Sequence, residues 1–154
     1  MHRFILSIAF LLGMSFNSHG KTDELAFEAV ETLFASISNV DHQKMRSVVT
    51  DSFVLLEHGE VWTIDDLVNV VTASEYVRTN FFSIISFEAM NDAYLVNYWN
   101  KAKLDNKKNS KDIIWLESAL IKNIDGKWLI SQLHTTRLDD KRAPKGVQFI
   151  QLKS

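Results

Sequence analysis

Two long apolar-rich runs joined by Asp125-Gly126 constrain the fold of this chain more than any other feature. Together the two runs extend from Lys111 to Leu138. An Asp-Gly pair between such runs predicts a β-hairpin with a two-residue type I′ turn, because both turn residues must adopt positive φ. A tight turn also fixes the strand register, which begins with Ile124 facing Lys127 and continues residue by residue from there.

The predicted register brings two ionisable side chains together across this hairpin. Glu117 falls opposite His134, and because side chains alternate between the faces of a strand, Trp115 and Thr136 lie beside that pair. A carboxylate next to an imidazole can fix its tautomer and raise its basicity, which is how a general base is prepared. The alternative interpretation is a cross-strand polar pair without a chemical role.

The rest of the chain predicts helices first and long strands afterwards. The expected elements are helices over 22–39, 41–49 and 63–73, a strand over 53–56 with a brief return at 61–62, and strands over 78–90 and 93–104. Asp41 and Thr63 are the expected helix caps, and Asp66 stands at the reciprocal position of a capping box. This order favours an α+β fold built on an antiparallel sheet.

The two ends of the chain are predicted to lie outside the domain. Arg3, an apolar run over 4–14, and the small residues Ser18 and Gly20 are typical of a signal peptide over 1–20, cleaved after Gly20. An uncleaved N-terminal anchor is the alternative. We expect the remainder to be exported, periplasmic or secreted, without stable membrane insertion after cleavage. The domain is expected over 21–138, and a charged tail over 139–154 ends in VQFIQL, which could add an edge strand or stay mobile.

Composition argues against several classes of function. The absence of cysteine excludes thiol nucleophiles and zinc–thiolate sites. The few glycines are not spaced as in a phosphate-binding loop, so no cofactor is expected, and the histidines show no metal-ligand spacing, so no metal is expected. The formal net charge of −2 argues against a nucleic-acid partner, which needs a basic face.

Several strings of the sequence resemble the NTF2-like superfamily, in particular its SnoaL-like/DUF4440 branch in secreted bacterial form. After a leading helix they occupy residues 51–62, 98–102, 115–118, 126–128 and 133–137. The resemblance implies a cone-shaped α+β fold, in which N-terminal helices pack on a strongly curved antiparallel sheet, and a homodimer formed through the open sheet face. It does not imply one reaction, because this fold hosts enzymes, binders and dimerisation modules alike.

The candidate site residues are those expected near the cavity of such a fold. His134 and Glu117 are the candidate catalytic pair. The candidate ligand-binding residues are Trp115, Trp99, Tyr98, His58, Glu57, Thr136 and Trp62. For the tryptophans the alternative is core packing. For Glu57 and His58 it is a purely structural turn.

Three functions remain open at this point. The first is an exported domain that binds a small, partly apolar molecule in the cavity. The second is a proton-transfer enzyme, such as an isomerase, cyclase or dehydratase, with His134 as base, Glu117 as its orienting group, and Tyr98 or His58 as acid. The third is a non-catalytic dimeric interaction module with a packed cavity. The sequence leaves open whether the protein is an enzyme.

Overall fold

The computed structural model describes residues 18–139, 142 and 144–152. Its elements are, in chain order, α1 (Ser18–Asn39), α2 (His42–Ser47), β1 (Val49–Glu57), β2 (Glu60–Trp62), α3 (Ile64–Val70), β3 (Val77–Met90), β4 (Ala93–Asp105), β5 (Ser110–Ile124), β6 (Lys127–Arg137) and β7 (Ile150–Gln151). Most of the predicted signal peptide, residues 1–17, lies outside the described residues, so its cleavage stays a prediction. None of the described helices combines the length and apolar character needed to span a bilayer.

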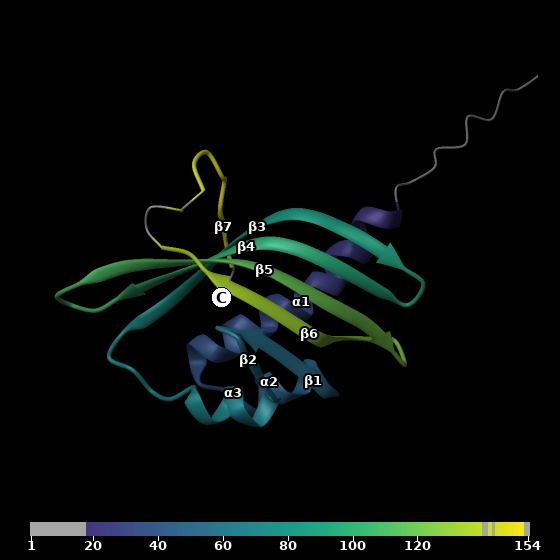
Figure 1. Ribbon diagram of the computed structural model, residues 1–154, viewed down its shortest axis with the longest axis horizontal. Coiled ribbons are helices and arrows are strands. Elements are labelled where there is room, and N and C mark those ends of the chain that lie inside the picture. Colours follow the sequence, from purple (N-terminus) through teal and green to yellow (C-terminus); the bar gives the residue numbers. More distant parts are fainter. Residues whose placement is uncertain (1–17, 140–141, 143, 153–154) are drawn as a thin grey trace, which may run out of the picture.

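The seven strands form one open sheet in the order β2-β1-β6-β5-β4-β3-β7. Neighbouring strands are antiparallel except β1 and β6, which run parallel. The predicted α+β fold with leading helices and a mostly antiparallel sheet is therefore confirmed. The sheet ends at β2 on one edge and β7 on the other, while the helices gather near one of its faces (Figure 1).

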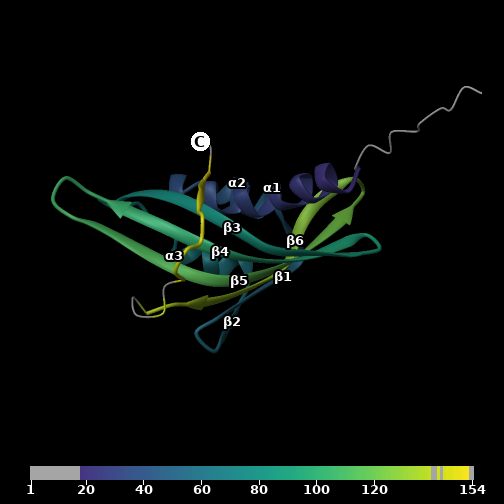
Figure 2. The ribbon, with the colours of Figure 1, turned by 90° about the horizontal axis from the view of Figure 1, so that it is seen from above.

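Helix α1 covers one face of the sheet, which we call the inner face (Figure 2). Ala26, Val30 and Leu33 are fully buried along one stripe of this helix, as the helical spacing predicts. Leu25 has a spacing that would also place it on this stripe, but its side chain is 43% exposed and Phe27 is buried instead. The buried stripe is centred one residue further round the helix, so Leu25 falls on its solvent edge. The face opposite α1 is called the outer face below.

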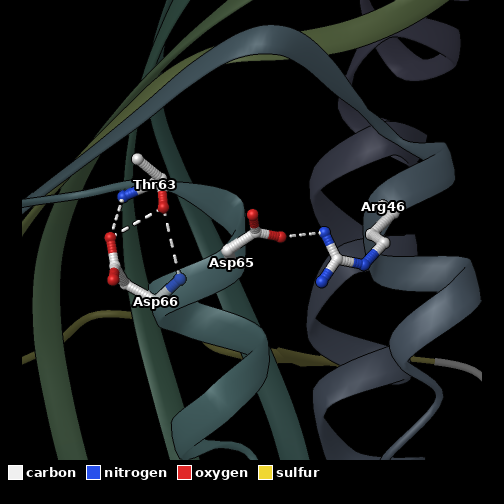
Figure 3. A network of polar contacts seen from close by, with 4 residues as sticks. All are labelled: Arg46, Thr63, Asp65 and Asp66. Atoms are coloured by element: carbon white, nitrogen blue, oxygen red, sulfur yellow. Dashed lines mark hydrogen bonds and ion pairs between the residues drawn. The ribbon is translucent and has the colours of Figure 1, made fainter.

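Both predicted helix caps are present, Asp41 on α2 and Thr63 on α3. Asp41 accepts a hydrogen bond from a backbone amide of α2. Thr63 and Asp66 form a reciprocal capping box, in which the Asp66 carboxylate accepts from the Thr63 amide at 2.8 Å (Figure 3). Arg46 of α2 forms an ion pair with Asp65 of α3, which ties the two short helices together. Helix α3 ends at Val70, three residues before its predicted end.

The Asp125-Gly126 hairpin turn is confirmed, but the register changes part-way along its strands. Both turn residues have positive φ, 52° and 80°. The predicted pairing holds from the turn as far as Ile121 and Ile130. There Ser131 is left without a partner, and Leu120 pairs with Gln132. This single extra residue in β6 is a β-bulge, which shifts every later pair by one position.

The bulge overturns the predicted pairing of Glu117 with His134. Glu117 faces Thr135 instead, and His134 faces Ser118. Because the side-chain period of a strand is two, a shift of one residue moves a side chain to the opposite face. Glu117 is buried on the inner face and His134 is exposed on the outer face, so the two side chains cannot form a dyad.

The tail returns to the sheet and covers its β3 edge. Strand β7 pairs antiparallel with Phe81 and Phe82 of β3, as the VQFIQL run suggested. The Leu152 amide donates to the carbonyl of Asn80 at 2.9 Å, and the Leu152 side chain packs against the core. The parts of the predicted tail at 140, 141, 143, 153 and 154 lie outside the described residues.

Candidate functional site

A cavity of about 230 Å³ lies between the helices and the inner face of the sheet, and we call it the inner pocket. Its apolar lining consists of Phe34, Ile37, Leu55, Trp62, Leu67, Val70, Val71, Trp115 and Leu133, and its polar lining of Glu57, Arg78, Glu117 and Thr135. A mostly apolar wall with a few convergent polar groups is typical of small-molecule sites. Larger hollows of about 590 and 510 Å³ open to the surface elsewhere, but neither is lined by a fully buried ionisable group.

Glu117 lies at the base of the inner pocket and is only 3% exposed. Among the described residues no other acidic or basic side chain is buried so deeply. The Asn100 side-chain amide lies 3.3 Å from both carboxylate oxygens. Burial raises the pKa of Glu117 to about 7, although the Tyr98 hydroxyl, the Asn100 amide and the Arg78 guanidinium act in the opposite direction. Glu117 can therefore exchange a proton close to neutral pH.

Glu117 belongs to a row of polar side chains that crosses four adjacent strands. Tyr98 of β4, Glu117 of β5, Thr135 of β6 and Glu57 of β1 are successive neighbours in this row. The Tyr98 and Thr135 hydroxyls are buried, and neither makes a hydrogen bond of good geometry among the described residues. The Tyr98 hydroxyl nevertheless lies close enough to the Glu117 carboxylate for each group to shift the pKa of the other. Burial raises the pKa of Tyr98 well above its ordinary value, and the Glu117 carboxylate raises it further. Tyr98 therefore stays neutral and can donate a hydrogen bond.

Arg78 of β3 brings a positive charge to the wall of the same pocket. Its guanidinium lies over the rings of Phe34 and Trp115, 5.7 and 5.6 Å from their centroids. Burial lowers the pKa of Arg78, while the carboxylates of Glu117 and Glu57 act in the opposite direction. An arginine remains charged under such conditions, so the pocket contains one cation and two carboxyl groups.

Glu57 and His58 occupy the turn between β1 and β2. Glu57 lines the inner pocket, whereas the His58 side chain is 65% exposed and is not part of the lining. The two side chains approach within 3.7 Å. His58 and Gly59 both have positive φ, which fits a tight two-residue turn. The structural interpretation of this turn therefore accounts for His58, while Glu57 belongs to the pocket.

The structure brings together some of the predicted site residues and separates others. Glu57, Trp62, Trp115 and Glu117 line the inner pocket, with Tyr98 buried beside Glu117. The predicted residues found away from this group are His58 at the turn and Trp99, His134 and Thr136 on the outer face.

The grouping of Trp99 and Thr136 with Trp115 is wrong for two different reasons. Trp99 follows the buried Tyr98 on β4, so strand alternation directs it to the outer face, where it pairs with Leu116. Thr136 lies beyond the bulge in β6, and the shifted register moves it to the outer face together with His134. Thr135 takes the place that Thr136 was predicted to hold.

Three polar residues of the site were not predicted, namely Arg78, Asn100 and Thr135. The sequence carries a signal for Arg78. It lies four residues before the buried Phe82 on the same strand, so both side chains are on the same face and the charge of Arg78 is on the core-facing side. Asn100 lies two residues after Tyr98 on β4, so it is on the same face and could have been found in the same way. Thr135 depends on the bulge, which the sequence pattern does not reveal.

Across residues 18–139, 142 and 144–152, no three His, Asp or Glu side chains gather in a group suited to a metal ion.

The arrangement of helices and sheet is that of an NTF2-like domain. A ketosteroid isomerase-like protein from Erwinia carotovora atroseptica has a TM-score of 0.62 and 16% identity, over 80% of this chain and 99% of that one. An NTF2-like protein from Cytophaga hutchinsonii has a TM-score of 0.63 and 15% identity, over 80% of this chain and 100% of that one. The CamKII hub homology domain from Chlamydomonas reinhardtii has a TM-score of 0.70 and 12% identity, over 77% of this chain and 99% of that one.

These similarities establish the fold and not a family, since all three identities are below one residue in five. No family model matches the sequence, and no curated protein matches it either. The chain therefore has the NTF2-like α+β fold, and its function has to be argued from its own pocket.

Proposed function

We propose that this protein is an exported NTF2-like domain of the SnoaL-like branch that binds a small, partly apolar molecule in the inner pocket. The observation that carries the proposal is Glu117, a fully buried carboxyl group at the base of an otherwise largely apolar cavity. Burying a carboxyl group is costly, and a core designed only for stability has no need of it. Export rests on the leader-like N-terminus alone.

The size of the pocket limits the ligand. About 230 Å³ is below the range of about 300–1,000 Å³ typical of sites for drug-sized molecules. Trp62 and Trp115 offer flat apolar surfaces for a ring or a short chain. Thr135 and Glu117 offer a hydroxyl and a carboxyl group to a polar substituent. A single-ring aromatic or short aliphatic molecule with one or two polar groups fits these limits.

Proton transfer is the second candidate function, and it now rests on Glu117 rather than on a His-Glu pair. A pKa of about 7 suits a general base at neutral pH, and the Tyr98 hydroxyl beside it suits a hydrogen-bond donor. Some of the structural neighbours are described as ketosteroid isomerase-like, but their identities to this chain are low. Isomerase, cyclase and dehydratase reactions that begin by removing a proton from the substrate use a base of this kind.

A homodimer through the outer face is part of the proposal. Trp99, Leu116 and Leu120 lie on this face and none of them is fully buried in the single chain. Other structural neighbours are described as CaMKII hub or association domains, names that refer to assembly. A purely structural dimerisation module is the remaining alternative, and it differs from the binding proposal in making no use of the inner pocket.

The binding proposal is tested with two matched variants on one strand. Thr135→Leu fills the inner pocket, while Thr136→Leu makes the same change on the outer face. Native mass spectrometry of the purified protein is combined with ligand-observed NMR of indole and phenol. We expect binding by the wild type and Thr136→Leu, and a loss of binding in Thr135→Leu. Equal binding by both variants would show that the inner pocket is not the site, and the same spectra report the dimer.

A further inference from the structure

Arg78 stands between the inner pocket and a second cavity of about 380 Å³, which we call the outer cavity. The outer cavity is lined by Ile37, Ser38, Asn39, Val40, Val70, Val71, Thr72, Ala73, Ser74, Tyr76, Arg78 and Leu104. Ile37, Val70, Val71 and Arg78 line both cavities. A molecule lying against these shared residues can therefore contact Arg78 from either side.

The electrostatic surroundings of Arg78 differ sharply between its two sides. The inner pocket contains Glu57 and Glu117, whereas among the described residues Arg78 is the only charged one in the lining of the outer cavity. Neither carboxylate forms an ion pair with Arg78 within 4.0 Å among the described residues. The guanidinium thus has no bonded counter-charge, and an anion on the outer side would approach it without meeting an acidic side chain of that cavity.

The guanidinium is held in a fixed orientation with its terminal amino groups uncommitted. Its Nε donates to the Asn80 side-chain oxygen at 2.8 Å, while the Asn80 amide donates to the Phe34 carbonyl and the Ser38 hydroxyl at 3.1 and 2.7 Å. Asn80 therefore anchors Arg78 to α1. Neither terminal amino group has a hydrogen-bond partner among the described residues. A pre-oriented fork of donors of this kind matches the two oxygens of a carboxylate.

We propose that the ligand is a small organic carboxylate, whose carboxylate pairs with Arg78 on the side of the outer cavity and whose apolar body packs against Ile37, Val70 and Val71. This inference rests on the proposed function, because the body of the ligand extends from these shared residues into the inner pocket. A cationic ligand would have to place its charge beside Arg78. A neutral ligand would leave the terminal amino groups of the arginine unpaired in a partly buried site.

The test compares acids with their neutral amides, using phenylacetate against phenylacetamide and hexanoate against hexanamide. Dissociation constants are measured by isothermal titration calorimetry at low salt for the wild type, Arg78→Met and Arg78→Lys. Arg142→Met is the matched control, because Arg142 is exposed in the tail and lines neither cavity. Thermal unfolding of each variant checks that it is folded. The ratio of the dissociation constants for amide and acid is compared within each protein, so it does not depend on differences in overall affinity between variants.

We expect the wild type and Arg142→Met to bind the acid at least about tenfold more tightly than the amide. In Arg78→Met the ratio falls to about one while amide binding persists, and Arg78→Lys gives an intermediate ratio. Equal affinities for acid and amide in the wild type would overturn the carboxylate inference and leave the binding proposal standing, provided that Thr135→Leu abolishes both. No binding of either compound to the wild type would overturn both proposals for ligands of this size.

Discussion

Replacing Glu117 by Gln is expected to remove a pH-dependent loss of stability. Glutamine has nearly the shape of a protonated glutamic acid and keeps an oxygen that can accept from Asn100. Burial raises the pKa of Glu117 from 4.5 to about 7, so the folded protein holds this proton more tightly than the unfolded chain. The contribution of Glu117 to the free energy of unfolding is therefore fully present below about pH 4.5. It is lost as the pH rises through about 7.

The magnitude follows from the size of the shift. One pKa unit corresponds to about 1.4 kcal/mol, so the complete effect is about 3 kcal/mol, of which about 2–3 kcal/mol falls between about pH 5 and pH 8.5. Glu117→Gln is thus expected to be close to the wild type in stability at about pH 5. At about pH 8.5 it should be more stable by about 2–3 kcal/mol.

Urea unfolding followed by tryptophan fluorescence measures this difference across the pH range. Glu31 contributes a pH dependence of the same sign, because burial and the neighbouring Glu28 raise its pKa, but this contribution cancels between variant and wild type. Glu88→Gln, at an exposed position of β3, is the control and should give a curve parallel to that of the wild type. A stability difference between Glu117→Gln and wild type that does not change with pH would refute the raised pKa. A difference that favours the wild type as pH rises would show that the Tyr98 hydroxyl, the Asn100 amide and the charge of Arg78 together outweigh burial.

Three further substitutions test the packing, the capping and the turn. Leu33→Ala should cost about 2–5 kcal/mol in urea unfolding, because it leaves a cavity under α1, while Leu25→Ala at the solvent edge of the same helix should cost well under half as much. Thr63→Ala should cost about 1 kcal/mol through loss of the capping box, and Thr72→Ala, an exposed threonine beyond the same helix, should be nearly silent. Gly126→Ala should cost about 1–2 kcal/mol from backbone strain alone, since no atom outside the turn lies within 4 Å of the added methyl group; an unchanged midpoint would argue against the left-handed turn.

Local signals in the sequence predicted the elements well, because each depends on neighbouring residues only. Asp125-Gly126 has to turn, and Thr63 with Asp66 has to begin a helix, whatever the rest of the chain does. The alternation of side chains along β4 likewise follows from neighbouring residues alone, and it places Tyr98 and Trp99 on opposite faces. The branch of the superfamily and the export of the protein go beyond what these local patterns determine.

The candidate site was predicted less completely, because it depends on features that are not local. Ser131 carries no residue-type signal for a bulge, yet it decides whether Thr135 or Thr136 faces Glu117. The parallel pairing of β1 with β6 brings Glu57 next to Thr135, and no pattern within either strand indicates it. Arg78 was not predicted, although its spacing from Phe82 puts it on the core-facing side of β3, because a charged residue at a strand end is usually solvated.

The parallel pairing of β1 with β6 also has a consequence for the order of folding. The β3–β4 and β4–β5 pairs join strands that follow one another, so their loops close early and at low entropic cost. Strand β1 finds its long neighbour only in the last long strand of the chain, after most of the domain has been made. Such distant pairings form slowly. Glu57 and Trp62 should therefore reach the pocket late, so that the ability to bind a ligand reports completion of the fold rather than its beginning.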